Sequence, residues 1–280
     1  MSAIAKTWFI TGASSGFGRA FAEHALAQGH NVVATARRAD RLQELAAQAP
    51  DRVLAVRLDV DQPDDAEAAV AAAIARFGRI DVLINNAGFA VLGAIEETPD
   101  AELRAIMDTN FFGAMAVTRA ALPHLRAQRS GAVVNITSMG GQMSFAGYGA
   151  YSASKFALEG ASEALAQEMA PFGVKVMIVE PGSFRTDLVA GALRAMPEIA
   201  DYAQSVGPTR AMTRDMNHTQ PGDPAKAAAA IEQALDAEVT PLRLQLGADA
   251  VGAIRAHAEA LLADLATWEA VAVATAIDEA

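Results

Sequence analysis

Cysteine is absent from this chain of 280 residues. Its absence excludes disulfide bonds, thiol nucleophiles and thiolate metal ligands, and it is typical of proteins that work in a reducing compartment. The histidines show no metal-ligand spacing, and they stand at His24, His30, His124, His218 and His257. We therefore predict neither a structural nor a catalytic metal.

Basic residues are also scarce. The chain has 22 Lys and Arg residues against 33 Asp and Glu residues, which gives a formal net charge of -11. Proteins that bind nucleic acid present a basic face to the phosphates, and anionic membranes attract basic segments. The charge balance therefore disfavours both partners, and we expect the ligand to be a small molecule.

Long hydrophobic runs are missing, although 52% of the residues are hydrophobic. No run reaches the roughly 18 residues that a membrane span requires. Residues 1–6, which precede the first strand pattern, are too short and too polar for a signal peptide. We expect a cytoplasmic protein with a single large core, since no repeat or flexible linker divides the chain.

Strand-forming runs alternate with helical patterns along most of the chain. Helices are indicated between these runs, for example over 63–77 and 224–237. The strand-forming runs cover 7–10, 31–36, 53–58, 82–84, 132–137, 174–179 and 242–246. Such alternation predicts an α/β fold, with a doubly wound, mainly parallel seven-stranded sheet and helices on both faces. We predict one domain over 1–247 and a helical extension over 248–280 packed on the same domain.

A glycine-rich turn joins the first strand to the first helix. Gly12, Gly16 and Gly18 allow tight backbone geometry there, and the helix start directs free N–H groups at an anion such as a pyrophosphate. The spacing G-x3-G-x-G departs from the usual dinucleotide fingerprint G-x-G-x-x-G. The alternative is an ordinary turn without a ligand.

The second strand ends in a small basic cluster, which bears on cofactor preference. Arg37 and Arg38 stand where sites that prefer NAD usually place an acidic residue for the ribose 2′-hydroxyl. An arginine there accommodates a 2′-phosphate. This favours NADP over NAD, unless the arginines belong only to the solvated face of the next helix.

Further polar residues follow successive strands, and a Tyr-x-x-x-Lys pair follows the fifth. Asp59 closes the third strand, and Ser138 closes the fifth. Tyr151 and Lys155 are four residues apart in a helical pattern, so they share a face, and a nearby ammonium favours the ionised phenol. The pair is a candidate for acid–base chemistry. A surface tyrosine beside a solvated lysine is the alternative.

The ordered motifs resemble those of the short-chain dehydrogenase/reductase family over residues 7–246. The matching residues are Thr11-Gly12-x-x-x-Gly16-x-Gly18, Asp59, Asn85-Asn86-Ala87-Gly88, Asn110, Ser138, Tyr151-x-x-x-Lys155, Pro181-Gly182 and Thr186. The resemblance implies a Rossmann-type fold and a homodimer or homotetramer. It also implies an enzyme that transfers hydride between a nicotinamide cofactor and a carbonyl or secondary alcohol.

The same resemblance implies a role for each site residue. Tyr151 would exchange a proton with the substrate oxygen, and Ser138 would hold and polarise that oxygen. Lys155 would lower the pKa of Tyr151 and bind ribose, while Asn110 would hold a water that links Lys155 to solvent. The cofactor would contact Gly12, Ser14, Ser15, Gly16, Phe17, Gly18, Arg37, Arg38, Asp59, Val60, Asn86, Ala87, Gly88, Tyr151, Lys155, Pro181, Gly182, Phe184 and Thr186. Phe184 departs from the small β-branched residue that is more frequent in the family.

Two questions stay open at the level of sequence. Residues 187–220 have weak periodicity, which suits either a lid over an apolar substrate or ordinary packing. The principal expectation is an oxidoreductase that prefers NADP(H) and accepts NAD(H), acting on a ketone or alcohol. The alternative is a non-catalytic protein of the same fold that senses a nucleotide or binds a partner.

Overall fold

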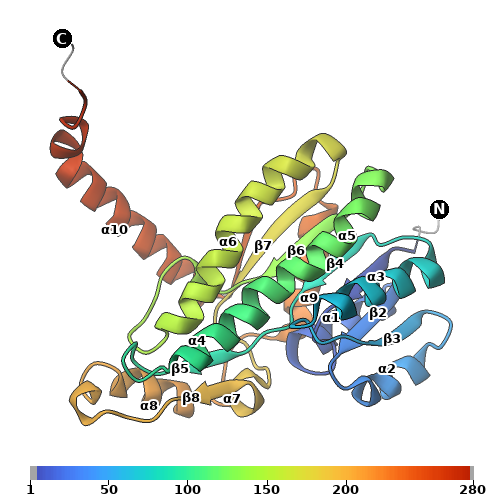
Figure 1. The fold of residues 1–280 in the computed structure, drawn as a ribbon, viewed down its shortest axis with the longest axis horizontal. Helices are drawn as coiled ribbons and strands as arrows, with labels where there is room; N and C mark the ends of the chain where they lie inside the picture. The colour runs from blue at the N-terminus through green and yellow to red at the C-terminus, as the bar shows by residue number, and fades with distance from the viewer. Residues whose placement is uncertain (1–4, 278–280) are drawn as a thin grey trace.

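A seven-stranded sheet lies at the centre of the molecule, and every strand pairs in parallel with its neighbours (Figure 1). The strand order is β3-β2-β1-β4-β6-β7-β9. The strands are β1 (Thr7–Ile10), β2 (Asn31–Ala36), β3 (Val53–Arg57), β4 (Val82–Asn85), β6 (Ala132–Ile136), β7 (Lys175–Pro181) and β9 (Arg243–Leu246). The predicted α/β architecture is thus confirmed. The order reverses beside β1, and ligands of open α/β sheets bind at such a point.

The computed structural model describes residues 5–277. The expected range 1–247 begins with residues 1–4, and the expected range 248–280 ends with residues 278–280. Both of these short segments lie outside the described residues. Short 3-10 turns connect several elements: η1 (Ala39–Leu42), η3 (Met139–Gly141), η4 (Ala170–Phe172) and η5 (Ala200–Tyr202).

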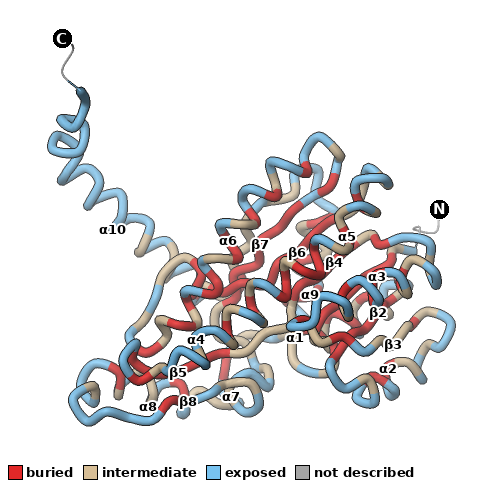
Figure 2. Tube along the Cα trace, viewed as in Figure 1, coloured by how far each residue is buried: buried red, intermediate tan, exposed pale blue. Residues whose placement is uncertain are grey.

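Helices cover both faces of the sheet and enclose two apolar layers (Figure 2). On one face lie α1 (Gly16–Ala27), α2 (Gln43–Gln48) and α9 (Pro224–Asp236), and on the other lie α3 (Pro63–Phe77), α5 (Ala114–Gln128) and α6 (Gly149–Met169). Successive side chains of a strand point to opposite faces, so Trp8 and Ile10 join the first layer and Phe9 joins the second. Because both faces are covered, the central strands are continuous hydrophobic runs.

The helical segment that includes Asn110 is interrupted. It consists of α4 (Asp100–Met107), a π-helical turn η2 (Asp108–Gly113) and α5. A Cβ on Gly113 would lie 2.8 Å from the Val60 side chain, so the turn packs on the segment that follows β3. Such π turns are frequent at functional sites.

Residues 187–220 contain more regular structure than the weak periodicity indicated. They form α7 (Leu188–Gly191), β8 (Leu193–Ala195), η5 and α8 (Gly207–Asp215). Strand β8 pairs in parallel with β5 (Ala90–Leu92) in a separate two-stranded sheet. This pairing attaches the segment to the loop that follows β4.

The C-terminal helix α10 (Ala248–Val273) corrects one expectation. We expected it to pack on the domain, but it projects away from it, and Ala250 is its one buried residue (Figures 1 and 2). The side chains along the rest of α10 are mostly exposed. A local helical pattern specifies a helix without specifying its neighbour. Within residues 5–277, none of the helices has the length and apolar character needed to cross a membrane.

Candidate active site

The glycine-rich turn is held against the end of β4 by Thr11. Its Oγ1 accepts hydrogen bonds from the backbone N–H groups of Asn86 and Ala87, both at 2.9 Å. The Asn86 amide donates to the Thr11 carbonyl at 2.8 Å. A Cβ on Gly18 would lie 2.3 Å from the Gly12 carbonyl oxygen, so only glycine fits there. The position of Thr11 in the glycine motif did not by itself predict this role.

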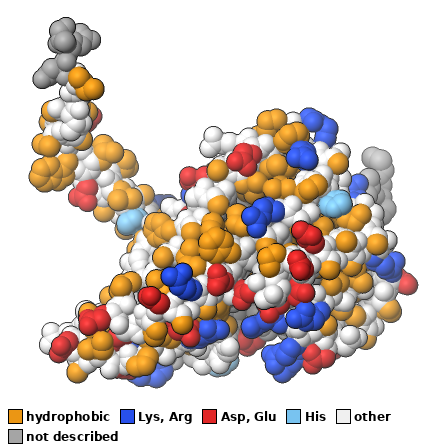
Figure 3. Space-filling model, in the orientation of Figure 1, with side chains coloured by type: hydrophobic (Ala, Val, Ile, Leu, Met, Phe, Trp, Pro, Cys, Tyr) orange, Lys and Arg blue, Asp and Glu red, His pale blue; other side chains and the backbone are white. Residues whose placement is uncertain are grey.

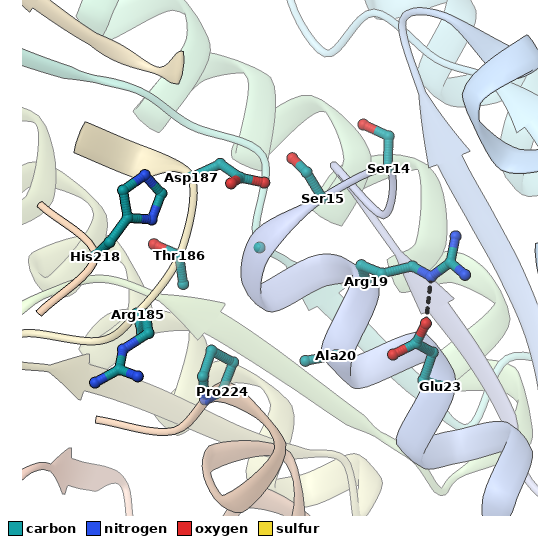
Figure 4. A pocket seen from close by; sticks show the side chains of 11 residues that line it. Ser14, Ser15, Arg19, Ala20, Glu23, Arg185, Thr186, Asp187, His218 and Pro224 are labelled. Atoms are coloured by element: carbon teal, nitrogen blue, oxygen red, sulfur yellow. Dashed lines mark hydrogen bonds and ion pairs between the residues drawn. The ribbon is translucent and has the colours of Figure 1, made fainter. Parts of the chain in front are cut away.

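A cavity of about 400 Å³ opens between this turn and the segment after β7. Ser14, Ser15 and Gly16 line one side, and Thr186 and Asp187 line the other (Figure 4). Ser15 begins α1 without a side-chain cap. The first N–H groups of α1 therefore suit an anionic ligand, and a dinucleotide diphosphate fits this combination of glycines, hydroxyls and helix start.

Phe184 fills a gap between the glycine turn and the segment before α9. Its ring centre lies 5.0 Å from that of Phe17, and a Cβ on Gly222 would lie 2.5 Å from the Phe184 ring. Gly222 therefore leaves the space that the large Phe184 side chain needs. The Phe184 carbonyl accepts a hydrogen bond from the Thr186 N–H at 2.9 Å, which closes a tight turn at this position.

The remaining predicted cofactor residues lie along the carboxyl edge of the sheet. Arg37 and Arg38 follow β2 and are exposed, and neither forms an ion pair within residues 5–277. Asp59 accepts a hydrogen bond from the Asp61 N–H at 3.3 Å. Pro181 ends β7, and the Gly182 N–H donates to the Leu246 carbonyl at 2.8 Å.

Tyr151 and Ser138 meet at Gly140. A Cβ on Gly140 would lie 3.3 Å from the Tyr151 ring and 3.4 Å from the Ser138 hydroxyl. Burial raises the pKa of the Tyr151 phenol to about 12, and a hydrogen bond with Ser138 opposes that rise. The sequence suggested a pKa lowered by Lys155, so the direction found here is the opposite.

Lys155 bonds to the sheet and not to the Tyr151 hydroxyl. Its Nζ donates to the Ile136 carbonyl at 2.9 Å and lies 5.7 Å from the centre of the Tyr151 ring. Burial lowers the pKa of Lys155 to about 8, while the charge of Glu159, one turn further along α6, raises it. The ammonium of Lys155 is thus directed at the end of β6 and lies beside the Tyr151 ring.

Asn110 belongs to a buried hydrogen-bond network and does not lie on an exposed face of its helical segment. Its side chain pairs with the Phe89 backbone through two bonds of 3.0 Å and donates to Ser154 Oγ at 2.9 Å. A Cβ on Gly88 would lie 2.9 Å from Asn110 Oδ1 and 3.7 Å from Lys155 Nζ. Ser154, inside the Tyr-x-x-x-Lys motif, was missed because a lone serine in a helix has no distinctive signal.

Residues 6–197 match the family model described as short chain dehydrogenase. The chain belongs to the short-chain dehydrogenase family.

Named relatives agree with this assignment. The dehydrogenase is 38% identical to Oxidoreductase BOA17 of Botryotinia fuckeliana, over 98% of this chain and 100% of that protein. It is 42% identical to a 3-ketodihydrosphingosine reductase of Bacteroides thetaiotaomicron, over 70% of this chain and 71% of that protein.

Solved structures extend the likeness to the fold. A short-chain dehydrogenase from Streptomyces avermitilis is 53% identical with a TM-score of 0.93, covering 98% of this chain and 100% of that one. A 3-ketoacyl-(acyl-carrier-protein) reductase from Brucella melitensis, complexed with NADH, is 27% identical with a TM-score of 0.73, covering 86% of this chain and 96% of that one. The dehydrogenase is accordingly an oxidoreductase that works with a nicotinamide cofactor.

An apolar wall adjoins Tyr151 in this dehydrogenase. Met196, from the 187–220 segment, packs in one cluster with Val91 and Ile106, and the rings of Phe89 and Tyr151 contact it. Tyr148 lies edge-on to Tyr151, with 6.0 Å between ring centres, and its hydroxyl is 2.9 Å from Thr213 of α8. The segment therefore contributes directly to the surroundings of the Tyr151 ring.

Proposed function

We propose that this chain is an NADP(H)-dependent oxidoreductase that transfers hydride between the nicotinamide and a carbonyl or secondary alcohol of an apolar substrate. The observation that supports this best is the convergence of Tyr151, Ser138 and Lys155 at the carboxyl ends of β6 and β7, next to the glycine turn. A proton donor, an oxygen-binding hydroxyl and a cation are the groups that carbonyl reduction needs.

The bound nicotinamide would supply or accept the hydride. Tyr151 would donate the proton to the substrate oxygen, because a phenol with a pKa of about 12 stays protonated at neutral pH. Ser138, which lies beside the Tyr151 phenol, would hold the same oxygen. Lys155 would bind ribose and stabilise negative charge that develops on Tyr151, while Asn110 would keep the backbone at Phe89 in position.

Residues along the sheet edge would hold the rest of the cofactor. The glycine turn and Thr186 would surround the diphosphate, because they line the cavity beside the start of α1. Asp59 and Val60 would lie at the adenine end. Arg37 and Arg38 would contact a 2′-phosphate, because both are exposed at the end of β2.

The proposed substrate carries an apolar group on the reacting carbon. Met196, Val91 and Phe89 surround the Tyr151 ring with hydrocarbon, and such surfaces bind apolar groups by removing them from water. The Bacteroides thetaiotaomicron relative, a 3-ketodihydrosphingosine reductase, supports a ketone substrate of this kind.

The decisive experiment is a panel of ketones and alcohols, small and hydrophilic through aromatic and long-chain, assayed with NADPH and NADH by absorbance of the reduced nicotinamide. We expect turnover with NADPH, highest for the apolar ketones. Higher turnover of small hydrophilic ketones would contradict the substrate class. Tight NADPH binding without turnover of any member would favour the nucleotide-sensing alternative.

A further inference from the structure

The helix α10 has a fixed direction at its base and, within residues 5–277, no neighbour along most of its length. Asp249 accepts a hydrogen bond from the Ser183 N–H at 2.7 Å, and a Cβ on Gly182 or Gly247 would collide with the Asp249 carboxylate. Ala250 is fully buried. These contacts hold the first turn of α10 on the domain. They therefore set the direction in which the rest of the helix leaves the domain (Figure 1).

The projecting part presents large apolar side chains to solvent. Leu261, Leu265 and Trp268 are 56%, 63% and 64% exposed. Figure 3 shows hydrophobic side chains along much of the visible face of α10. A contiguous exposed apolar surface of this kind marks an interaction site.

The spacing of these residues identifies the kind of surface that covers them. Positions three and four residues apart alternate along one stripe: Val251, Ile254, Ala258, Leu261, Leu265, Trp268 and Ala272. A repeat of 3.5 residues is the pattern by which one helix packs along another. Ala256, Ala263 and Ala270 occupy the opposite side of the helix.

An anionic membrane does not fit this stripe. The stripe from Ile254 to Ala272 is about 28 Å long at 1.5 Å per residue. The projecting part carries Glu259, Asp264 and Glu269 against a single Arg255, which disfavours an anionic lipid surface.

We propose that α10 pairs antiparallel with α10 of a second copy of this chain, around a twofold axis level with Ala263. This register places Ala258 against Trp268 of the second copy, and Leu261 against Leu265 of the second copy. Small side chains thus face large ones at both ends, and leucines meet at the centre. The same contacts repeat across the axis, as a twofold interface requires.

Charge supports this register. Arg255 and Glu269 flank the stripe on the same edge, fourteen residues apart in sequence. In the antiparallel register, Arg255 of each copy lies opposite Glu269 of the other, which gives two ion pairs. A shift by one heptad places Arg255 opposite Leu262 instead. Among the charged residues, Asp264 alone meets its own equivalent beside the axis.

Thiol cross-linking tests the pairing directly, because the full chain has no cysteine. Leu262→Cys places a single thiol beside the interface near the axis, and its matched control Ala263→Cys places one on the outer side. With a short bismaleimide, we expect a covalent dimer from the first variant and little from the second. Equal cross-linking of both, or none from Leu262→Cys, would overturn the proposal.

Charge exchange then tests the identity of the partner and the register. In the Leu262→Cys background, Leu265→Asp should abolish the cross-link, and Arg255→Glu should weaken association roughly tenfold, as measured by light scattering across a dilution series. Adding Glu269→Arg to Arg255→Glu should restore it, since the pairs re-form with reversed signs. A double variant that associates no better than the single one would rule out this pairing. Turnover by each variant checks that the domain remains folded.

Discussion

Lys155 lies 5.7 Å from the centre of the Tyr151 ring and directs its ammonium to the Ile136 carbonyl, 2.9 Å away. Both side chains come from α6, but the same surroundings shift their pKa values in opposite directions. Burial disfavours the charged form of each group, so it raises the pKa of the phenol to about 12 and lowers that of the ammonium to about 8.

Tyr151→Phe tests the proposed proton donor. We expect ketone reduction to fall by about 10²- to 10⁴-fold, since this is what general acid catalysis contributes. NADPH affinity, measured by fluorescence titration, should stay nearly unchanged. Tyr148→Phe is the control, because Tyr148 lies edge-on to Tyr151 and its hydroxyl hydrogen-bonds with Thr213, but it lies outside the proposed proton path. Comparable turnover in the Tyr151→Phe and Tyr148→Phe variants would remove Tyr151 from the mechanism.

Arg37→Ala tests the cofactor preference. NADPH should bind about 10- to 100-fold more weakly, because a charge-assisted hydrogen bond contributes about 1.5–3 kcal/mol. NADH affinity should change little, since NADH has no 2′-phosphate. Arg41→Ala, an exposed arginine in η1, is the matched control. An equal loss of affinity for both cofactors in Arg37→Ala would contradict the NADP assignment.

The pKa of Lys155 predicts a pH dependence of stability. The folded pKa is about 8 against an ordinary 10.5, so between these values the unfolded chain binds more protons than the folded one. The free energy of unfolding should therefore gain on the order of 2 kcal/mol from this group between pH 7.5 and 9.5. The measurement is urea denaturation of the wild type and Lys155→Met at both pH values.

The difference in pH dependence between the wild type and Lys155→Met separates the contribution of Lys155 from those of other titrating groups. Lys155→Met should lose this increment, whereas Lys226→Met, which removes an exposed lysine of α9, should keep it. The opposite contribution of Tyr151 lies between pH 10 and about 12, where the raised folded pKa lowers stability as pH rises. An unchanged pH dependence in Lys155→Met would show that the ammonium is not desolvated.

A buried ion pair attaches the 187–220 segment to the domain. Glu97 accepts hydrogen bonds of 2.7 Å from Arg210 and from the Ile199 and Ala94 N–H groups, and these bonds lower its pKa. Arg210→Met leaves the carboxylate without its cation, which costs about 3 kcal/mol for a buried pair. We expect a higher KM for the apolar ketone and an unchanged Kd for NADPH.

Arg214→Met, an exposed arginine of the same helix α8, controls for general effects on that helix. Hydrogen exchange of residues 196–215 should quicken in Arg210→Met and not in Arg214→Met. If exchange quickens while KM stays constant, the segment packs on the domain without contributing to substrate binding.

The elements that sequence predicted correctly are those with a strong local pattern. The runs 7–10 and 31–36 agree with β1 and β2 in both bounds, because continuous apolar runs between turn residues leave few other structures. The polar and glycine residues after each strand reach a common edge because parallel strands share their direction. The neighbourhood of Gly12, Asn86, Ser138 and Tyr151 follows from that topology.

The elements that sequence missed depend on distant parts of the chain. Strands β5 and β8 have three residues each and are about a hundred residues apart, so neither shows a readable period. The π turn at Asn110 exists together with its bonds to Phe89 and Ser154, which no spacing reveals. Phe184 departs from the residue that is more frequent in the family, and the space for its ring comes from Gly222, nearly forty residues away.

The amino-acid sequence by itself determined the alternation of strands and helices, the order of the polar groups along them and the heptad stripe of α10, since each is a local periodicity. Only the tertiary structure decided that Tyr151 holds its proton more tightly and that α10 leaves the domain. A pKa depends on how much water the surrounding chain removes. The direction of a helix depends on the few contacts at its base, here those of Asp249 with Ser183 and Gly182.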